Sequence, residues 1–203
     1  MRARAPTITE HLTAISRVLE PLGVRWFVFG AQAVIAAGAV RQTADIDITT
    51  EDVPVERLRR ALKKAGFELR EGIDGIEELI EHHRILPLEH RKTGLQLDVV
   101  RAGPGPEELM LGRVIQRKIG RRLIPFVETN DLLVLKTLAG REKDLEDVRA
   151  LLRTRSPEID VAIVRRRLAE LSALLDDSTL VDLFEAQLSA IARGAAGRTP
   201  LRR

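Results

Sequence analysis

The chain has 203 residues, of which 44% are hydrophobic, and a formal net charge of +3. This composition supports a folded core and excludes a disordered chain, and so small a net charge does not by itself predict nucleic-acid binding. No stretch approaches the roughly 18 apolar residues of a membrane span, and no apolar signal segment follows Met-Arg-Ala-Arg. The sequence has no cysteine, which excludes disulfides and thiolate metal sites. We therefore expect a cytoplasmic protein without membrane association.

Apolar periodicity in the first 128 residues predicts alternating helices and strands, and hence an α+β fold. The expected helices are 8–20, with Thr7 as N-cap, 31–37 and 55–65. The expected strands are 26–29, 44–49, 67–70 and 93–100, followed by a hairpin over 114–127 that turns at Ile119-Gly120. Residues 71–77 predict a loop, and 79–88 are ambiguous, with a strand favoured because it would pair with 93–100.

From Thr129 onward the pattern becomes purely helical. The expected helices are 130–139, 142–153, 157–175 and 177–191. The last ten residues are rich in Gly and Arg and predict a frayed tail. The domain prediction is therefore an α+β core over residues 1–128, a helical domain over 129–193 and a disordered tail over 194–203.

Two aspartates on one predicted strand are the main candidates for chemistry. Asp45 and Asp47 are two residues apart, so their side chains leave the same face of the strand, about 7 Å apart at the backbone. Such a pair repels itself and needs a cation, a basic residue or a shared proton. Asp98 is a third carboxylate, set among apolar residues in another strand. Three converging carboxylates would suit Mg²⁺, and Gly30 at a helix start would offer N–H groups to a phosphate.

These residues resemble a known family. Gly30, then Asp45-x-Asp47, then Asp98 in an apolar strand is similar to the nucleotidyltransferase superfamily related to DNA polymerase beta. The variant Gly30-Ala31-Gln32-Ala33 with Arg41-x-Thr43-x-Asp45 most resembles the AbiEii-type nucleotidyltransferase toxins and their uncharacterised bacterial relatives. Lys136, followed by Arg141-x-x-Asp144-x-x-Asp147, adds to the resemblance, which covers residues 25 to about 153.

The resemblance implies a mixed β-sheet flanked by helices, with a C-terminal helical bundle. It also implies Mg²⁺-dependent transfer of a nucleoside monophosphate from a nucleoside triphosphate to an acceptor hydroxyl. Asp45, Asp47 and Asp98 would be the catalytic and metal-binding residues. The nucleotide-binding residues would be Gly30, Ala31, Arg41, Thr43, Lys136 and Arg141. The implied acceptor is the 3′ end of a tRNA, and the implied partner is a cognate antitoxin.

Two alternatives to this function stay open. The acceptor would instead be a protein, or a small molecule such as an aminoglycoside. In the other alternative the chain is a degenerate module that binds nucleotide without chemistry, because Ala31 stands where the family usually has Gly or Ser. Alanine keeps the backbone N–H but has no hydroxyl and restricts φ.

Other polar residues have simpler explanations as well. Lys136 lies among leucines and would snorkel, and Arg141, Asp144 and Asp147 have the spacing of an intrahelical salt bridge. A zinc site at His82, His83 and His90 is disfavoured because adjacent histidines on a strand face opposite ways. The basic clusters around Arg117–Arg122 and Arg165–Arg167 are typical of solvated faces, but they would contact phosphates if the substrate is RNA.

Overall fold

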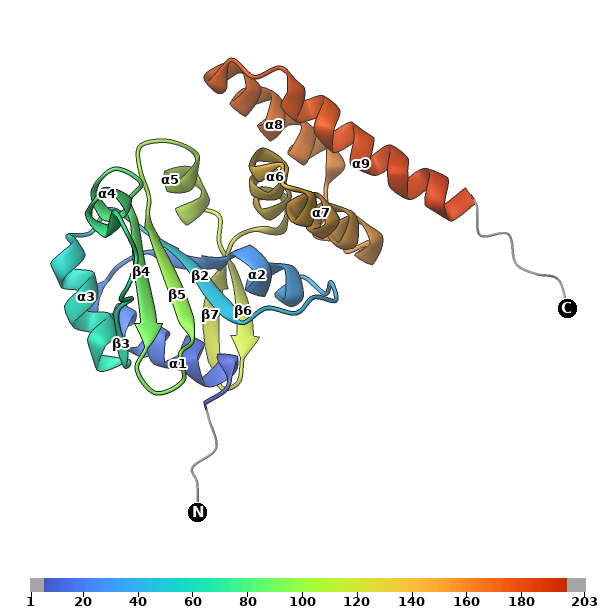
Figure 1. Ribbon diagram of the computed structural model, residues 1–203. Helices are drawn as coiled ribbons and strands as arrows, with labels where there is room; N and C mark the ends of the chain where they lie inside the picture. The colour runs from blue at the N-terminus through green and yellow to red at the C-terminus, as the bar shows by residue number, and fades with distance from the viewer. Residues whose placement is uncertain (1–5, 197–203) are drawn as a thin grey trace, which may run out of the picture. The chain divides into compact units, whose positions relative to one another are not determined.

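The computed structural model describes residues 6–196, which form two compact units (Figure 1). The first unit contains the described residues up to Ala33 together with Arg41–Glu128. The second contains Val34–Val40 and the described residues from Thr129 onward. Helix α2, Gly30–Ala36, begins in the first unit and ends in the second. No helix in this part of the chain is long and apolar enough to cross a membrane.

The first unit is built on a seven-stranded mixed sheet in the order β3-β4-β5-β2-β1-β7-β6 (Figure 1). The strands are β1 Trp26–Phe29, β2 Asp45–Thr50, β3 Phe67–Leu69, β4 Ile85–His90, β5 Gln96–Arg101, β6 Ile115–Ile119 and β7 Arg122–Phe126. The pairs β2–β5 and β1–β7 are parallel and the other pairs are antiparallel. The α+β class predicted from the sequence is confirmed.

One face of this sheet is apolar and covered by helices. Alternation along β2 and β5 places Ile46, Ile48, Leu97 and Val99 on that face, and all four are fully buried. Helix α1, Ile8–Leu19, packs against β6 and β7 at one edge of the sheet, and helix α3, Val55–Lys64, packs against β3 at the other edge. The two helices also contact each other. The same alternation leaves Asp45, Asp47 and Asp98 on the opposite face.

The start of α1 shows why the sequence predicted it correctly. The Thr7 side chain accepts a hydrogen bond from the Glu10 backbone N–H at 3.3 Å, and the Glu10 carboxylate accepts from the Thr7 N–H at 2.6 Å. This capping box satisfies N–H groups that a helix start leaves without partners.

Residues 71–88 differ from the prediction of a loop followed by a strand. Ile76–Glu81 form helix α4, and β4 begins only at Ile85. Gly75 adopts a left-handed φ of +70° and starts the helix, and Arg84, at φ +59°, turns the chain into β4. The apolar run was too short for its period to distinguish a helix from a strand.

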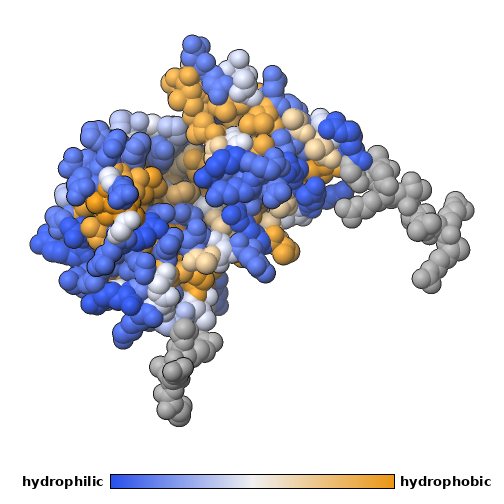
Figure 2. Space-filling model, viewed as in Figure 1, coloured by the Kyte–Doolittle hydropathy of each residue, from blue (hydrophilic) through white to orange (hydrophobic). Residues whose placement is uncertain are grey.

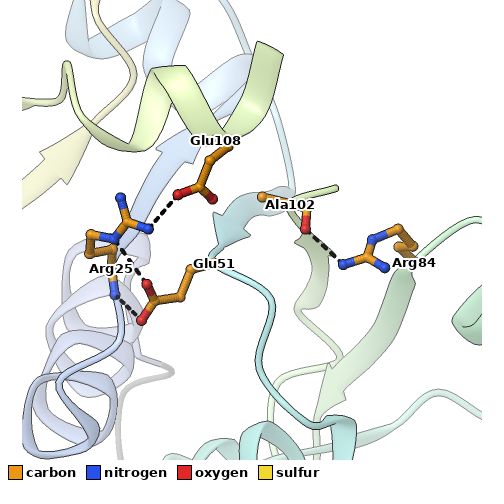
Figure 3. A network of polar contacts seen from close by, with 5 residues as sticks. All are labelled: Arg25, Glu51, Arg84, Ala102 and Glu108. Atoms are coloured by element: carbon orange, nitrogen blue, oxygen red, sulfur yellow. Dashed lines mark hydrogen bonds and ion pairs between the residues drawn. The ribbon is translucent and has the colours of Figure 1, made fainter. Parts of the chain in front are cut away.

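Polar contacts join the ends of β2 and β5 that lie farthest from Asp45 and Asp98 (Figure 3). Arg25, which precedes β1, binds Glu51 at 2.9 Å and Glu108 at 2.5 Å. Glu108 belongs to helix α5, Pro106–Leu111. Arg84 donates to the Ala102 carbonyl at 2.7 Å. These contacts tie the strand ends to the helix and turns that follow them.

The second unit is helical. Its helices are α6 Thr129–Ala139, α7 Glu142–Thr154, α8 Val161–Leu175 and α9 Thr179–Ala196. Helix α8 starts four residues later than predicted, because Asp160 caps it by accepting from the N–H groups of Ala162 and Ile163. Apolar surface is visible where α8 meets α9 (Figure 2), where Leu174 and Leu175 are exposed. Helix α9 continues past the predicted end to Ala196, and residues 197–203 of the predicted tail lie outside the described part.

Candidate active site

The three candidate aspartates lie on one face of the sheet, on the neighbouring parallel strands β2 and β5. Asp47 is the register partner of Asp98, and Asp45 is the partner of Gln96. Register partners point to the same face and neighbouring strands are about 4.8 Å apart, so Asp47 and Asp98 are direct neighbours. Asp45 follows two residues away on the same face of β2. The structure therefore brings together three carboxylates, of which the first, Asp45, and the last, Asp98, are 53 residues apart in the sequence.

Gly30 lies directly against the Asp47 side chain. A Cβ atom at position 30 would be 1.9 Å from Asp47 Oδ2, and the backbone there has a φ of +61°. An L side chain at this position would be strained and would also displace the carboxylate. The glycine is therefore needed for two separate reasons, the left-handed backbone and the position of Asp47.

Ala31, the departure from the family pattern, has an ordinary helical place. Its side chain is only 4% exposed, and it is not among the described residues with positive φ. The left-handed conformation falls on Gly30 instead, so the restricted φ of alanine causes no conflict here. What the site lacks relative to a serine is the hydroxyl alone.

Two neighbours orient the β2 end of the site. The buried Gln32 side chain donates from Nε2 to the Asp45 carbonyl at 3.1 Å. The Thr43 hydroxyl donates to the Asp45 carboxylate. Arg41 lies half-buried in the segment between α2 and β2. The sequence did not single out Gln32, although its place beside Gly30 and Ala31 was the available signal.

Asp98 has a partner that no pattern in the sequence indicated. Arg70, directly after β3, forms an ion pair with its carboxylate. Burial raises the pKa of Asp98 above its usual value, the charge and hydrogen bond of Arg70 oppose this, and the negative charge of Asp45 adds to it. Arg70 stood at the end of a predicted strand, and nothing in the sequence indicated that this strand would lie near Asp98.

The chemistry of these donors suits a hard cation. Oxygen ligands from several carboxylates are what Mg²⁺ prefers, and the clustered negative charge needs compensation. Within residues 6–196, however, no three His, Asp or Glu side chains are grouped so that they could hold one metal ion. Asp98 is bound by Arg70, so completing a three-carboxylate site requires Asp98 to leave the arginine.

Lys136 and Arg141 belong to the second unit, where they bind carboxylates. Lys136 Nζ lies 2.7 Å from Asp144 Oδ1 and 2.9 Å from Asp147 Oδ2, with its side chain only 10% exposed. Arg141 Nε lies 2.5 Å from Asp144 Oδ2, and its side chain is largely exposed. The simpler explanation of Lys136, snorkelling among leucines, is wrong, since the amine lies in a buried ion-pair network.

The arginine cluster at 165–167 is engaged within the protein. Arg165 binds Glu185 at 2.5 Å and Arg167 binds the buried Asp131 at 2.9 Å, while Arg166 lies 3.8 Å from Glu170. In the other cluster, Arg122 is paired with Glu20. Cations already bound to carboxylates contribute less to binding RNA phosphates.

The histidines are not arranged as the sequence suggested. His82 caps the end of α4 and His83 follows it, so the strand alternation assumed for this pair is wrong. His90 packs against His11, with ring centroids 4.5 Å apart, and burial lowers the pKa of both. His11 and His90 therefore pack at the apolar face of the sheet, whereas His82 and His83 are exposed.

A Gly30→Ala variant is expected to lose about tenfold to a hundredfold in any activity that depends on Asp47, because its methyl group would displace that carboxylate. It should also lose roughly 1 kcal/mol of stability from the left-handed backbone. Gly23→Ala is the matched control, since Gly23 has a similar φ of +65° and no atom within 4 Å of its added Cβ. Urea unfolding and activity of both variants check this. Equal activity of the two would contradict the steric role.

Comparison with solved structures supports the fold. No protein family model matches the sequence, and no curated protein matches it. Among solved structures, the antibiotic-resistance factor ANT(2'')-Ia is similar over 94% of this chain and 97% of that one, with a TM-score of 0.54 and 14% identity. An antigenic nucleotidyltransferase-like protein from Paracoccidioides brasiliensis is similar over 87% and 94%, with a TM-score of 0.51 and 18% identity.

A third similar structure is the lincomycin-bound lincosamide antibiotic adenylyltransferase LnuA. It covers 73% of this chain and 98% of its own, with a TM-score of 0.50 and 16% identity. At identities this low, the similarity shows the fold alone. The fold is thus of the nucleotidyltransferase type, with a mixed sheet flanked by helices and followed by a helical bundle.

Proposed function

We propose that the protein is a Mg²⁺-dependent nucleotidyltransferase that moves a nucleoside monophosphate from a nucleoside triphosphate to an acceptor hydroxyl. The observation that carries the proposal is the register pairing of Asp47 with Asp98, with Asp45 on the same face. The negative charges of neighbouring carboxylates on one sheet face repel each other, and Mg²⁺ at Asp45 and Asp47 would add to the compensation that Arg70 gives Asp98. The nucleotidyltransferase-type fold supports the same conclusion.

In this proposal the three aspartates have different roles. Asp45 and Asp47 would hold Mg²⁺, and Asp98 would complete the set. Mg²⁺ bound there would supply positive charge to the α-phosphate and to the leaving pyrophosphate. Asp98 accepts the proton of the acceptor hydroxyl while the new O–P bond forms and the bond to pyrophosphate breaks.

The remaining candidates would contact the nucleotide. The N–H groups of Gly30 and Ala31 would face a phosphate, and Thr43 would keep Asp45 oriented while Arg41 adds positive charge. Lys136 and Arg141 remain proposed triphosphate contacts on the strength of the resemblance. For Arg141 the exposed guanidinium is compatible with this role, whereas Lys136 would first have to leave two carboxylates.

The first acceptor to consider is the 3′ end of a tRNA, as in a toxin of a toxin–antitoxin system with a cognate antitoxin. The second is a small-molecule hydroxyl. It is favoured by the similarity in fold to the antibiotic-resistance factor ANT(2'')-Ia and to the lincosamide antibiotic adenylyltransferase LnuA. The ion pairs that engage Arg165 and Arg167 also weaken one of the two surfaces expected to bind RNA.

One experiment separates these acceptors. The protein is incubated with Mg²⁺ and each α-labelled nucleoside triphosphate, together with total tRNA, cell protein or a panel of aminoglycosides and lincosamides. Label on tRNA supports the toxin function, and label on a small molecule or a protein supports the corresponding alternative. Label on none of them, with nucleotide still bound, would favour the degenerate binding module.

A further inference from the structure

The row of side chains that holds Asp47 and Asp98 continues across the sheet to Arg70. Asp98 is the register partner of Pro87 on β4, and the Arg70 backbone N–H donates to the Pro87 carbonyl at 3.1 Å. With strands about 4.8 Å apart, Arg70 starts two strand spacings from Asp98. Its side chain therefore crosses Pro87 to reach the carboxylate, a distance that only a long side chain can span.

The arginine is held there in a largely buried position. Its side chain is 18% exposed, and Nη2 donates to Asp98 Oδ1. The Nε atom is buried and has no hydrogen-bond partner among residues 6–196. A buried donor without a partner is costly, so the ion pair with Asp98 is the compensation that keeps the guanidinium in place. The guanidinium thus supplies positive charge to the acidic face.

We infer that Arg70 is a positioning residue that holds Asp98 and competes with the divalent cation for its carboxylate. The inference rests on the proposed function, since it assumes that Asp98 joins the metal site. A guanidinium on one carboxylate of the set both occupies an oxygen and repels a dication. The triphosphate offers Arg70 another anion, so metal and nucleotide bind together more readily than metal alone.

Metal binding without turnover tests this directly. Mn²⁺ is titrated into the full-length, nucleotide-free protein, and free Mn²⁺ is measured by electron paramagnetic resonance. Arg70→Gln and Arg70→Met are expected to bind Mn²⁺ about tenfold more tightly than the wild type, since both lose the competing charge. Arg70→Lys keeps that charge and should stay close to the wild type. With a non-hydrolysable triphosphate analogue present, the wild type and the neutral variants should converge.

Arg25→Gln is the matched control. Arg25 also pairs with carboxylates, Glu51 and Glu108, but Glu51 lies four residues beyond Asp47, about 13 Å along the chain. Its Mn²⁺ affinity should equal that of the wild type, because salt screens a charge at that distance. Thermal unfolding is followed for each variant, and the methionine variant keeps the apolar stem over Pro87 should the glutamine variant fold poorly.

The outcomes distinguish the two proposals. If the wild type binds Mn²⁺ and transfers nucleotide, but neither neutral variant binds Mn²⁺ more tightly, the inference about Arg70 is overturned and the proposed function stands. If neither the wild type nor the variants bind Mn²⁺, with or without the analogue, the proposed function fails and the inference fails with it. Tighter binding in both neutral variants, together with unchanged binding in Arg70→Lys and Arg25→Gln, supports the inference.

Discussion

An Asp47→Asn variant is expected to lose at least about a thousandfold in kcat/KM for nucleotidyl transfer. Asparagine keeps the shape of the side chain against Gly30 but removes the negative charge shared with Asp98. A neutral amide is a poor ligand for Mg²⁺, so the metal would no longer be held between the two strands. The free energy of unfolding should change by less than about 1 kcal/mol, because the substitution removes charge repulsion rather than packing.

Asp52→Asn is the matched control for this variant. Asp52 follows the other end of β2, is largely exposed, and pairs with Arg84 and Arg101. The same chemical change there should leave transfer unaltered, since both ion pairs lie at the end of β2 away from the site. Label transfer and urea unfolding are measured for both variants. If Asp47→Asn keeps more than a tenth of the wild-type rate, the assignment of Asp47 as a metal ligand is wrong.

A Lys136→Met variant is expected to lower the free energy of unfolding by about 3–5 kcal/mol. Methionine fills a similar volume, but it leaves Asp144 and Asp147 without the amine that now lies within 3 Å of both. Asp144 is only 1% exposed, so water cannot replace the lost partner. The two carboxylates would stay buried with only part of their negative charge compensated, and this lowers the free energy of unfolding.

The pH dependence of this effect has a definite sign. Burial acts to raise the pKa of Asp144, but the hydrogen bonds from Arg141 and Lys136 outweigh it, and the pKa is lowered from 3.8. The network therefore adds stability above pH 3.8, which is lost as the pH falls through the lower folded-state value. The difference between the wild type and Lys136→Met should accordingly shrink as the pH falls below about 3.8.

Lys143→Met serves as its control, because Lys143 lies exposed on α7 one residue before Asp144. It should change the free energy of unfolding by less than about 0.5 kcal/mol. Urea unfolding of the wild type, Lys136→Met and Lys143→Met is measured at pH 7 and across the acid range. A loss below about 1 kcal/mol for Lys136→Met would show that the network does not stabilise the helical unit.

Local signals in the sequence were sufficient for most of the elements. The Thr7 and Glu10 capping pair predicted the start of α1, and alternation around Asp45–Thr49 predicted β2 within a residue at each end. These predictions succeeded because capping and alternation depend on neighbours within four residues. The prediction for residues 76–88 was wrong for the same reason, since a short apolar run has no clear period. The start of α8 was placed at residue 157, four residues before the helix that Asp160 caps.

Residue type and spacing were sufficient to predict three carboxylates on apolar strands, a glycine at a helix start and a mixed α+β order. The partners of these residues depend on how distant segments pack in the folded protein. The register of β2 with β5 placed Asp47 beside Asp98, and the short edge strand β3 brought Arg70 to the same carboxylate. Strand order and register come from packing between segments that are distant in the chain, and no local pattern specifies them.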